Sequence, residues 1–322
     1  MKKRTKNISI RRVRYSQLLL GCLIWCAACE RSEIIPPVKS PTEVETPDVP
    51  VEETTVKKGV GMSTSTTIGV WWKNIINLKP HWYYTWGTFI PDSQMDNVPQ
   101  NCEFVPMFWN GAAATQENID KLNALYEEGK ISHVLGFNEP DLTGEANMSV
   151  GDALAKWKFI SDNLNPGIKL VSPATSYPSL SETSWMVQFM DGVAEQNLRV
   201  DYMAVHIYQP NTASLFTDPI NAVYQRWGKK VWVTEFGVRD DNTGGDLSKN
   251  RYTPAQMLTF AQSLLPQLES MESVDRYAWF NSSPTMSGLW PCALIGADGL
   301  PTALGDYYGA LNPNFAIAAA GQ

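Results

Sequence analysis

Two glutamates lie at the ends of apolar runs that have the length and composition of buried strands. The run 132–138 ends at Asn138 and leads directly to Glu139, and the run 230–237 contains Glu235. Glycoside hydrolysis requires a pair of carboxyl groups beside the scissile bond, because one protonates the leaving oxygen while the other attacks or activates water. The two glutamates are therefore the first candidates for catalysis.

Other polar residues near these strand ends suit the same chemistry. His206 and Tyr208 close the run 201–208, and they share one face because alternate residues of a strand point the same way. We expect His206 to hydrogen-bond to the glutamates or tune their charge, and we expect both His206 and Tyr208 to contact the substrate. Pro140 restricts the residue before it, so Glu139 is expected to be extended at its strand tip.

Aromatic residues are abundant, with 12 tryptophans, 12 tyrosines and 11 phenylalanines in 322 residues. Sugar rings expose apolar C–H faces that pack against aromatic rings, so carbohydrate sites are rich in them. Some of these rings must fill the core. From the strand ends we expect substrate contacts from Trp72, Tyr84, Trp86, Trp109 and Trp279.

Eight short apolar runs alternate with amphipathic stretches, and nearly continuous apolar character is typical of parallel strands buried on both faces. This alternation predicts a single (β/α)8 TIM barrel of the α/β class, with short or missing helices after the first two strands. A doubly wound sheet usually carries a glycine-rich loop after its first strand, and none is present here. The predicted strands are 67–72, 82–86, 103–109, 132–138, 168–174, 201–208, 230–237 and 276–281.

The N-terminal part reads as a targeting segment and a linker. Residues 1–28 combine a basic stretch with a short apolar run that is too short to span a bilayer, followed by small residues before Cys29. This resembles a bacterial lipoprotein signal peptide in which Cys29 is lipidated; an ordinary secretory signal is the alternative. Residues 29–60 predict a Pro/Glu/Thr-rich tether, and 61–322 the catalytic barrel. We expect an outer-membrane lipoprotein facing the periplasm or the cell surface.

Charge and motifs narrow the range of partners. The net charge is −7, and removing residues 1–28 removes seven positive charges and no negative ones, leaving −14. Such acidity disfavours nucleic acid and anionic polysaccharide and suits a neutral glycan. No metal-binding or nucleotide-binding motif occurs, so we expect no metal and no cofactor. We also expect the protein to be a monomer. Cys102 and Cys292 fall at opposite ends of the predicted barrel, too far apart for a disulfide.

The motifs WYYTWG, FVPMFWNG, VLGFNEPD, AVHIY, VWVTEFG, YAWFN and GLPTALGDYY follow one another as in glycoside hydrolase family 128, which this chain resembles over roughly residues 66–312. The resemblance implies a retaining β-1,3-glucanase with Glu139 as acid/base and Glu235 as nucleophile. It also implies that Asn138 binds the sugar 2-hydroxyl and that Tyr208 hydrogen-bonds the nucleophile.

The substrate and the mode of action are less closely defined. We expect a laminarin-like or curdlan-like glucan as the substrate, and endo rather than exo action. The segment after the eighth strand is long enough to form a wall of the groove. Two alternatives stay open: a barrel glycosidase for another neutral β-glycan such as xylan or mannan, and a surface glycan-binding lipoprotein without turnover.

Overall fold

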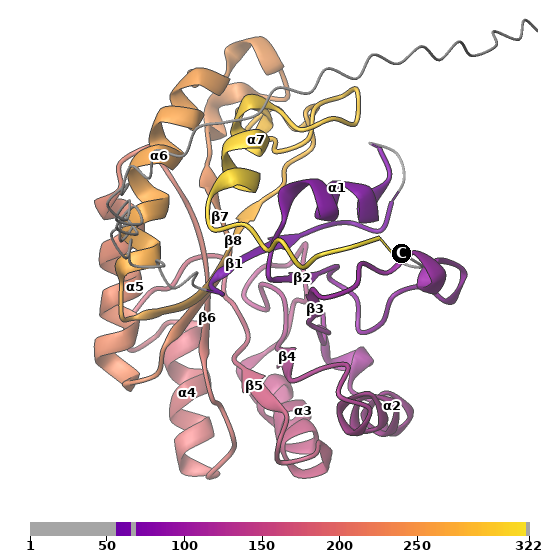
Figure 1. Ribbon diagram of the computed structural model, residues 1–322. Helices are drawn as coiled ribbons and strands as arrows, with labels where there is room; N and C mark the ends of the chain where they lie inside the picture. Colours follow the sequence, from indigo (N-terminus) through magenta and orange to yellow (C-terminus); the bar gives the residue numbers. More distant parts are fainter. Residues whose placement is uncertain (1–55, 66–68, 320–322) are drawn as a thin grey trace, which may run out of the picture. The chain divides into compact units, whose positions relative to one another are not determined.

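Parallel strands form the central layer of the computed structural model, which describes residues 56–65 and 69–319 (Figure 1). Their order along the chain follows the prediction of a (β/α)8 barrel, which is confirmed. The strands are β1 Lys58–Gly61, β2 Trp82–Tyr84, β3 Glu103–Phe104, β4 His133–Leu135, β5 Lys169–Val171, β6 Met203–Gln209, β7 Val231–Val238 and β8 Val274–Phe280.

Single bridges join two groups of hydrogen-bonded strands into a ring. One sheet has the order β3-β2-β1-β8-β7-β6, and β4 pairs with β5. A parallel bridge between Met107 and Leu135 connects the chain after β3 to β4. A second bridge between Val171 and Tyr202 connects β5 to the start of β6. All eight strands therefore follow one another around the barrel, so their C-terminal ends share one face.

Helices surround the strands, and several begin where the sequence offers a capping side chain (Figure 1). Thr253 forms a capping box with Gln256 at the start of α6, which satisfies donors that the first helical turn leaves free. After β1 there is only the eight-residue α1, and after β2 only the 3-10 turn Asp92–Asn97, as predicted for these two connections. The helices are α1 Trp71–Leu78, α2 Gln116–Glu127, α3 Val150–Asn163, α4 Trp185–Glu195, α5 Ser214–Trp227, α6 Pro254–Ser270 and α7 Ala303–Ala310.

The first strand was predicted in the wrong place. The predicted strand 67–72 overlaps α1, in which Trp71, Ile75 and Leu78 are buried at helical spacing. The true β1 begins at Lys58, inside the range predicted as tether, so the barrel starts earlier than residue 61.

Strand β1 has the sequence KGVG. A search for apolar runs misses it because two of its four residues are glycine. Both glycines are required by close packing against β2. A Cβ at Gly59 would lie 2.1 Å from the ring of Trp82, and one at Gly61 would lie 2.7 Å from the Tyr84 hydroxyl. The large aromatic rings of β2 thus occupy the space that side chains of β1 would need.

The N-terminal end of the barrel holds a largely buried ion pair. Arg276 Nη1 lies 2.7 Å from Glu103 Oε2, and His133 Nδ1 lies 2.9 Å from Glu103 Oε1. The Arg276 guanidinium also lies 4.4 Å from the ring of Trp232, a cation–π contact. Burial alone would raise the pKa of Glu103, but the hydrogen bond from His133 and the charge of Arg276 lower it to about 2. This cluster stabilises the floor of the barrel.

The remaining predictions about the chain have mixed outcomes. Cys102 and Cys292 are free thiols, which confirms that they are not paired. Within the described ranges, no helix has the length and apolar character needed to cross a bilayer. The predicted signal peptide 1–28, the lipidation residue Cys29 and most of the tether lie outside the described residues.

Candidate active site

Glu235 points into the barrel because β7 contains an irregularity. Strict alternation from the inward-facing Trp232 would direct Thr234 inward and Glu235 outward. The register with β6 shifts here, since Val205 pairs with Val233 but His206 pairs with Glu235. Such a bulge inserts one residue and re-aims the next side chain. The Glu235 carboxylate is consequently placed at the C-terminal mouth, with its side chain 6% exposed.

Glu139 lies just after β4, in a backbone conformation that the sequence did not predict. Its φ is +42°, in the left-handed region, so the expected extended geometry is wrong. Pro140 disfavours the right-handed helical conformation of its predecessor but does not impose a strand. Here the chain turns at once: the Glu139 amide donates to the carbonyl of Ala174, and the Glu139 carbonyl accepts from Leu142. A bulky residue held in this region is strained, a condition found at functional sites.

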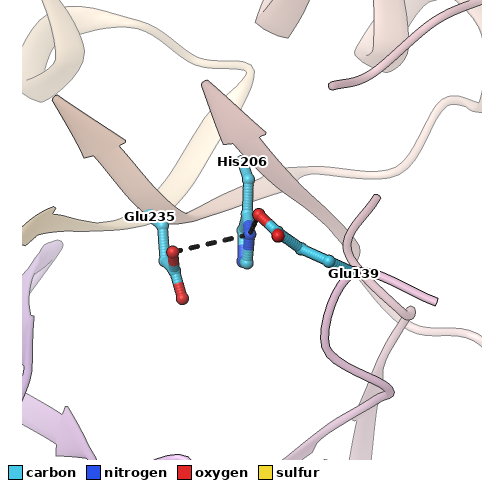
Figure 2. Close-up of side chains that lie close together, drawn as sticks. All are labelled: Glu139, His206 and Glu235. Carbon is cyan, nitrogen blue, oxygen red and sulfur yellow. Dashed lines mark hydrogen bonds and ion pairs between the residues drawn. The ribbon is translucent and has the colours of Figure 1, made fainter. Parts of the chain in front are cut away.

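His206 lies between the two carboxylates, as Figure 2 shows. Its Nδ1 is 2.8 Å from Glu139 Oε1 and 3.6 Å from Glu235 Oε2. The ring is completely buried, so the prediction of a direct substrate contact is wrong, whereas the expected hydrogen bond to a glutamate is present. Burial would lower the pKa of His206, but the charge of Glu235 and the hydrogen bond and charge of Glu139 raise it.

Two neutral donors hold the carboxylate of Glu235, and a third hydroxyl lies close to it. The indole N–H of Trp86 donates to Oε1 at 2.7 Å, and the Tyr208 hydroxyl donates to Oε2 at 2.5 Å. The Tyr84 hydroxyl donates to the Thr234 carbonyl at 2.9 Å and lies 3.4 Å from Oε1. Burial and the negative charge of Glu235 raise the pKa of both tyrosines well above the usual value. Their hydroxyls therefore keep their protons and remain donors.

A cavity of about 690 Å³ opens over the two glutamates. Asn138 and Glu145 also border it, and Asn138 Nδ2 donates to Glu145 Oε2 at 3.1 Å. The loop after Glu139 folds back, since the Ala146 amide donates to the Asn138 carbonyl, and this brings Glu145 to the site. Among the described residues, the buried Asn138 Oδ1 has no hydrogen-bond partner, so this acceptor is unused within the protein.

The structure separates the predicted aromatic contacts into two groups. Trp86, Trp109 and Tyr208 line the cavity, as expected. The buried Tyr84 does not line it; Tyr84 lies behind Glu235 and contacts that carboxylate instead. Trp72 lies on α1 and packs against the core between strands and helices, so its predicted strand-tip position is wrong.

Trp279 is not a sugar platform. It is fully buried, its indole N–H donates to the Cys292 carbonyl, and its ring packs 5.2 Å from that of Phe236. The outward side of β8 therefore holds Trp279, and Phe280, the next residue, faces the cavity. The alternation along β8 could have identified Phe280, because Ala278 belongs to the barrel interior.

Comparisons with known proteins identify the family to which this chain belongs. Residues 59–308 match the family described as "Glycosyl hydrolase catalytic core". The chain is 30% identical to a subgroup I GH128 endo-β-1,3-glucanase from Amycolatopsis mediterranei, solved in complex with laminaritriose. That alignment covers 80% of this chain and 99% of the other, with a TM-score of 0.67. The chain belongs to glycoside hydrolase family 128.

Two further relatives show the range of proteins similar to this family 128 chain. "Alkali-sensitive linkage protein 1" of Schizosaccharomyces pombe is 27% identical over 231 residues, which are 70% of this chain. The alignment spans only 38% of that curated relative's length. A subgroup VII GH128 oligosaccharide-binding protein from Cryptococcus neoformans has a TM-score of 0.60 over 80% of this chain and 95% of the other. At 22% identity it supports the fold alone.

The family 128 site also includes residues that the sequence analysis missed. Glu145 is six positions after Glu139 in a loop, where no periodicity predicts its direction. Glu145 is a third carboxyl group in the cavity wall. Burial and the charge of Glu139 raise its pKa. The long segment after β8 supplies part of the wall, as expected, through Ser283, Pro284, Met286, Leu289 and Ile295.

Proposed function

We propose that this protein is a retaining endo-β-1,3-glucanase. The observation that carries the proposal is the approach of Glu139 and Glu235, which have carboxylate oxygens within 4.8 Å of each other beside a cavity lined by aromatic rings. Retaining glycosidases hold their carboxyl groups about 5–5.5 Å apart, whereas inverting enzymes need room for a water between them. The similarity to an endo-β-1,3-glucanase of the same family supports the substrate.

In this mechanism Glu139 and Glu235 have complementary roles. Glu139 donates its proton to the leaving glycosidic oxygen while a Glu235 oxygen attacks the anomeric carbon, which gives a glycosyl–enzyme ester. Glu139, now ionised, then takes a proton from water as the water attacks the same carbon and releases Glu235. Asn138 would bind the 2-hydroxyl of the sugar, and Trp86, Trp109 and Phe280 would pack against sugar faces. These steps call on no metal or cofactor.

Hydrolysis assays on laminarin, curdlan, mixed-linkage glucan, xylan and mannan test this function. We expect laminarin and curdlan to release oligosaccharides. Proton NMR of the early products should show that the anomeric configuration is retained. Release of a ladder of lengths from laminarin indicates endo action. Preferred cleavage of xylan or mannan would replace the substrate assignment.

The alternative is a binding protein without turnover; the oligosaccharide-binding family member, at 22% identity, supports only the shared fold. Tight binding of laminari-oligosaccharides without cleavage would support that alternative and contradict the enzyme. The intact pair of glutamates beside Asn138 favours the enzyme.

The proposed location is the outer membrane of a bacterium, with lipid on Cys29 and a tether that allows the barrel to reach a polymer. A single acyl chain binds membranes only weakly, so stable anchoring requires a multiply acylated cysteine. Replacing Cys29 by Ala should move the protein from the membrane fraction to the soluble fraction. Retention in the membrane fraction would contradict this assignment.

A further inference from the structure

We propose that Trp86 is a positioning residue for the nucleophile: its indole N–H fixes one oxygen of Glu235, and the same ring forms part of the sugar-binding wall. The inference rests on the proposed function, because it gives Trp86 a role in orienting the attacking carboxylate. The indole Nε1 lies 2.7 Å from Glu235 Oε1, and Trp86 lines the cavity above the two glutamates.

The two oxygens of Glu235 are held from two sides of the barrel. Trp86 follows β2 and donates to Oε1, whereas Tyr208 on β6 donates to Oε2. A carboxylate held by only one donor can rotate about its last carbon–carbon bond, and a second donor on the other oxygen prevents this. The pair of donors therefore defines the plane of the nucleophile before substrate arrives.

Both donors are neutral, and this distinguishes them from an ionic clamp. Throughout residues 56–65 and 69–319, no lysine or arginine forms an ion pair with Glu235, and His206 at 3.6 Å is its one basic neighbour within 4 Å. An N–H donor orients an anion without neutralising it. Glu235 can thus be fixed in direction while it keeps the electron density needed to attack the anomeric carbon.

The backbone of Trp86 is adapted to this contact. Its φ is +59°, a left-handed conformation that is unfavourable for a bulky residue and persists only where the surroundings impose it. The ring packs edge-on against Tyr84 at 4.9 Å and Phe280 at 6.0 Å between ring centres. These contacts leave the N–H edge directed at Glu235 while the side chain remains partly exposed to the cavity.

One experiment removes the donor and keeps the ring. Incorporating 3-benzothienylalanine at position 86 replaces the indole N–H by sulfur with almost the same shape. We expect kcat on laminarin to fall about 10- to 100-fold, as for loss of a hydrogen bond to a charged group, while KM changes little.

The matched control is Trp227, which ends α5 and whose ring lies 5.5 Å from the Arg226 guanidinium. The same analogue at position 227 should leave kcat and KM unchanged. An unchanged kcat with the analogue at position 86 would overturn the inference. A rise in KM alone would show that Trp86 serves only as a sugar platform, and would overturn it equally.

A spectroscopic measurement tests the contact without relying on turnover. In protein labelled with 15N-tryptophan, the indole N–H signal that disappears in Trp86→Phe identifies Trp86. We expect this signal to move more than any other indole signal when Glu235→Gln removes the charge. If it does not move, the contact is absent and the inference fails. If the signal moves but the wild-type protein cleaves no β-glucan, the proposed function fails while the contact stands.

Discussion

His206 and Glu139 form a buried contact, with His206 Nδ1 2.8 Å from Glu139 Oε1. They come from different strands, since Glu139 follows β4 and His206 lies within β6. The same ring nitrogen is 3.6 Å from Glu235, so one imidazole is shared between the proposed acid/base and the proposed nucleophile. This arrangement places one buried imidazole against both carboxyl groups of the proposed catalytic pair.

The first prediction concerns the two carboxylates. Glu235→Gln and Glu139→Gln should each lower kcat on laminarin by at least about a thousandfold with an unchanged unfolding transition, because each removes a group that forms or breaks bonds. With Glu139→Ala and an activated aryl glucoside, added azide should restore turnover by attacking the glycosyl–enzyme without a base. Near-normal turnover of Glu235→Gln would show that the nucleophile is another residue.

The second prediction uses the raised pKa of His206, whose ordinary value is 6.5. A basic group with a raised folded pKa contributes stability that is fully present below its unfolded pKa and is lost as the pH rises through the folded pKa. Wild type should therefore exceed His206→Gln in free energy of unfolding most clearly below about pH 6, and the difference should shrink at higher pH. Urea unfolding across this range measures it; a difference that grows with pH would contradict the raised pKa.

The third prediction concerns the floor of the barrel. Glu103 has a pKa lowered from 4.5 to about 2, so its contribution is present above pH 4.5 and is lost as the pH falls through about 2. Glu103→Gln should cost about 3 kcal/mol of unfolding free energy at neutral pH and much less near pH 2. Denaturant unfolding at both pH values provides the test.

A matched control for Glu103 is Glu128→Gln. Glu128 pairs with Lys130, and its side chain is 54% exposed, so its removal should change stability by less than about 0.5 kcal/mol. Equal losses for the two variants would mean that the buried cluster contributes no more than a surface ion pair.

The fourth prediction concerns where the folded barrel begins. A chain starting at Glu52 should fold and keep full activity on laminarin. A chain starting at Met62 lacks β1 and should show no cooperative unfolding. Lys57 Nζ donates to carbonyls at the end of α6, and Lys58 Nζ to carbonyls of Tyr308 and Leu311 at the end of α7. Circular dichroism during heating compares the two chains. A fully active chain from Met62 would show that β1 is dispensable.

The sequence determined the class of the fold and the identity of the two glutamates. Parallel strands are buried on both faces, so they leave apolar runs that can be recognised without a structure. In a barrel, residues at the C-terminal ends of strands share one face, and this rule assigns Glu139 and Glu235 to the same end of the barrel. The exception was β1, whose glycines give no apolar run because the rings of Trp82 and Tyr84 occupy the space beside it.

Only the tertiary structure decided how the side chains of the site are directed. Alternation by itself would turn Glu235 outward, and the register shift against β6 reverses this. The left-handed turn at Glu139 is maintained by hydrogen bonds to residues beyond Pro140 and on the chain after β5. The contact between Trp86 and Glu235 joins positions 149 residues apart. Local sequence preferences cannot specify such features, because they depend on pairing and packing between segments distant in the chain.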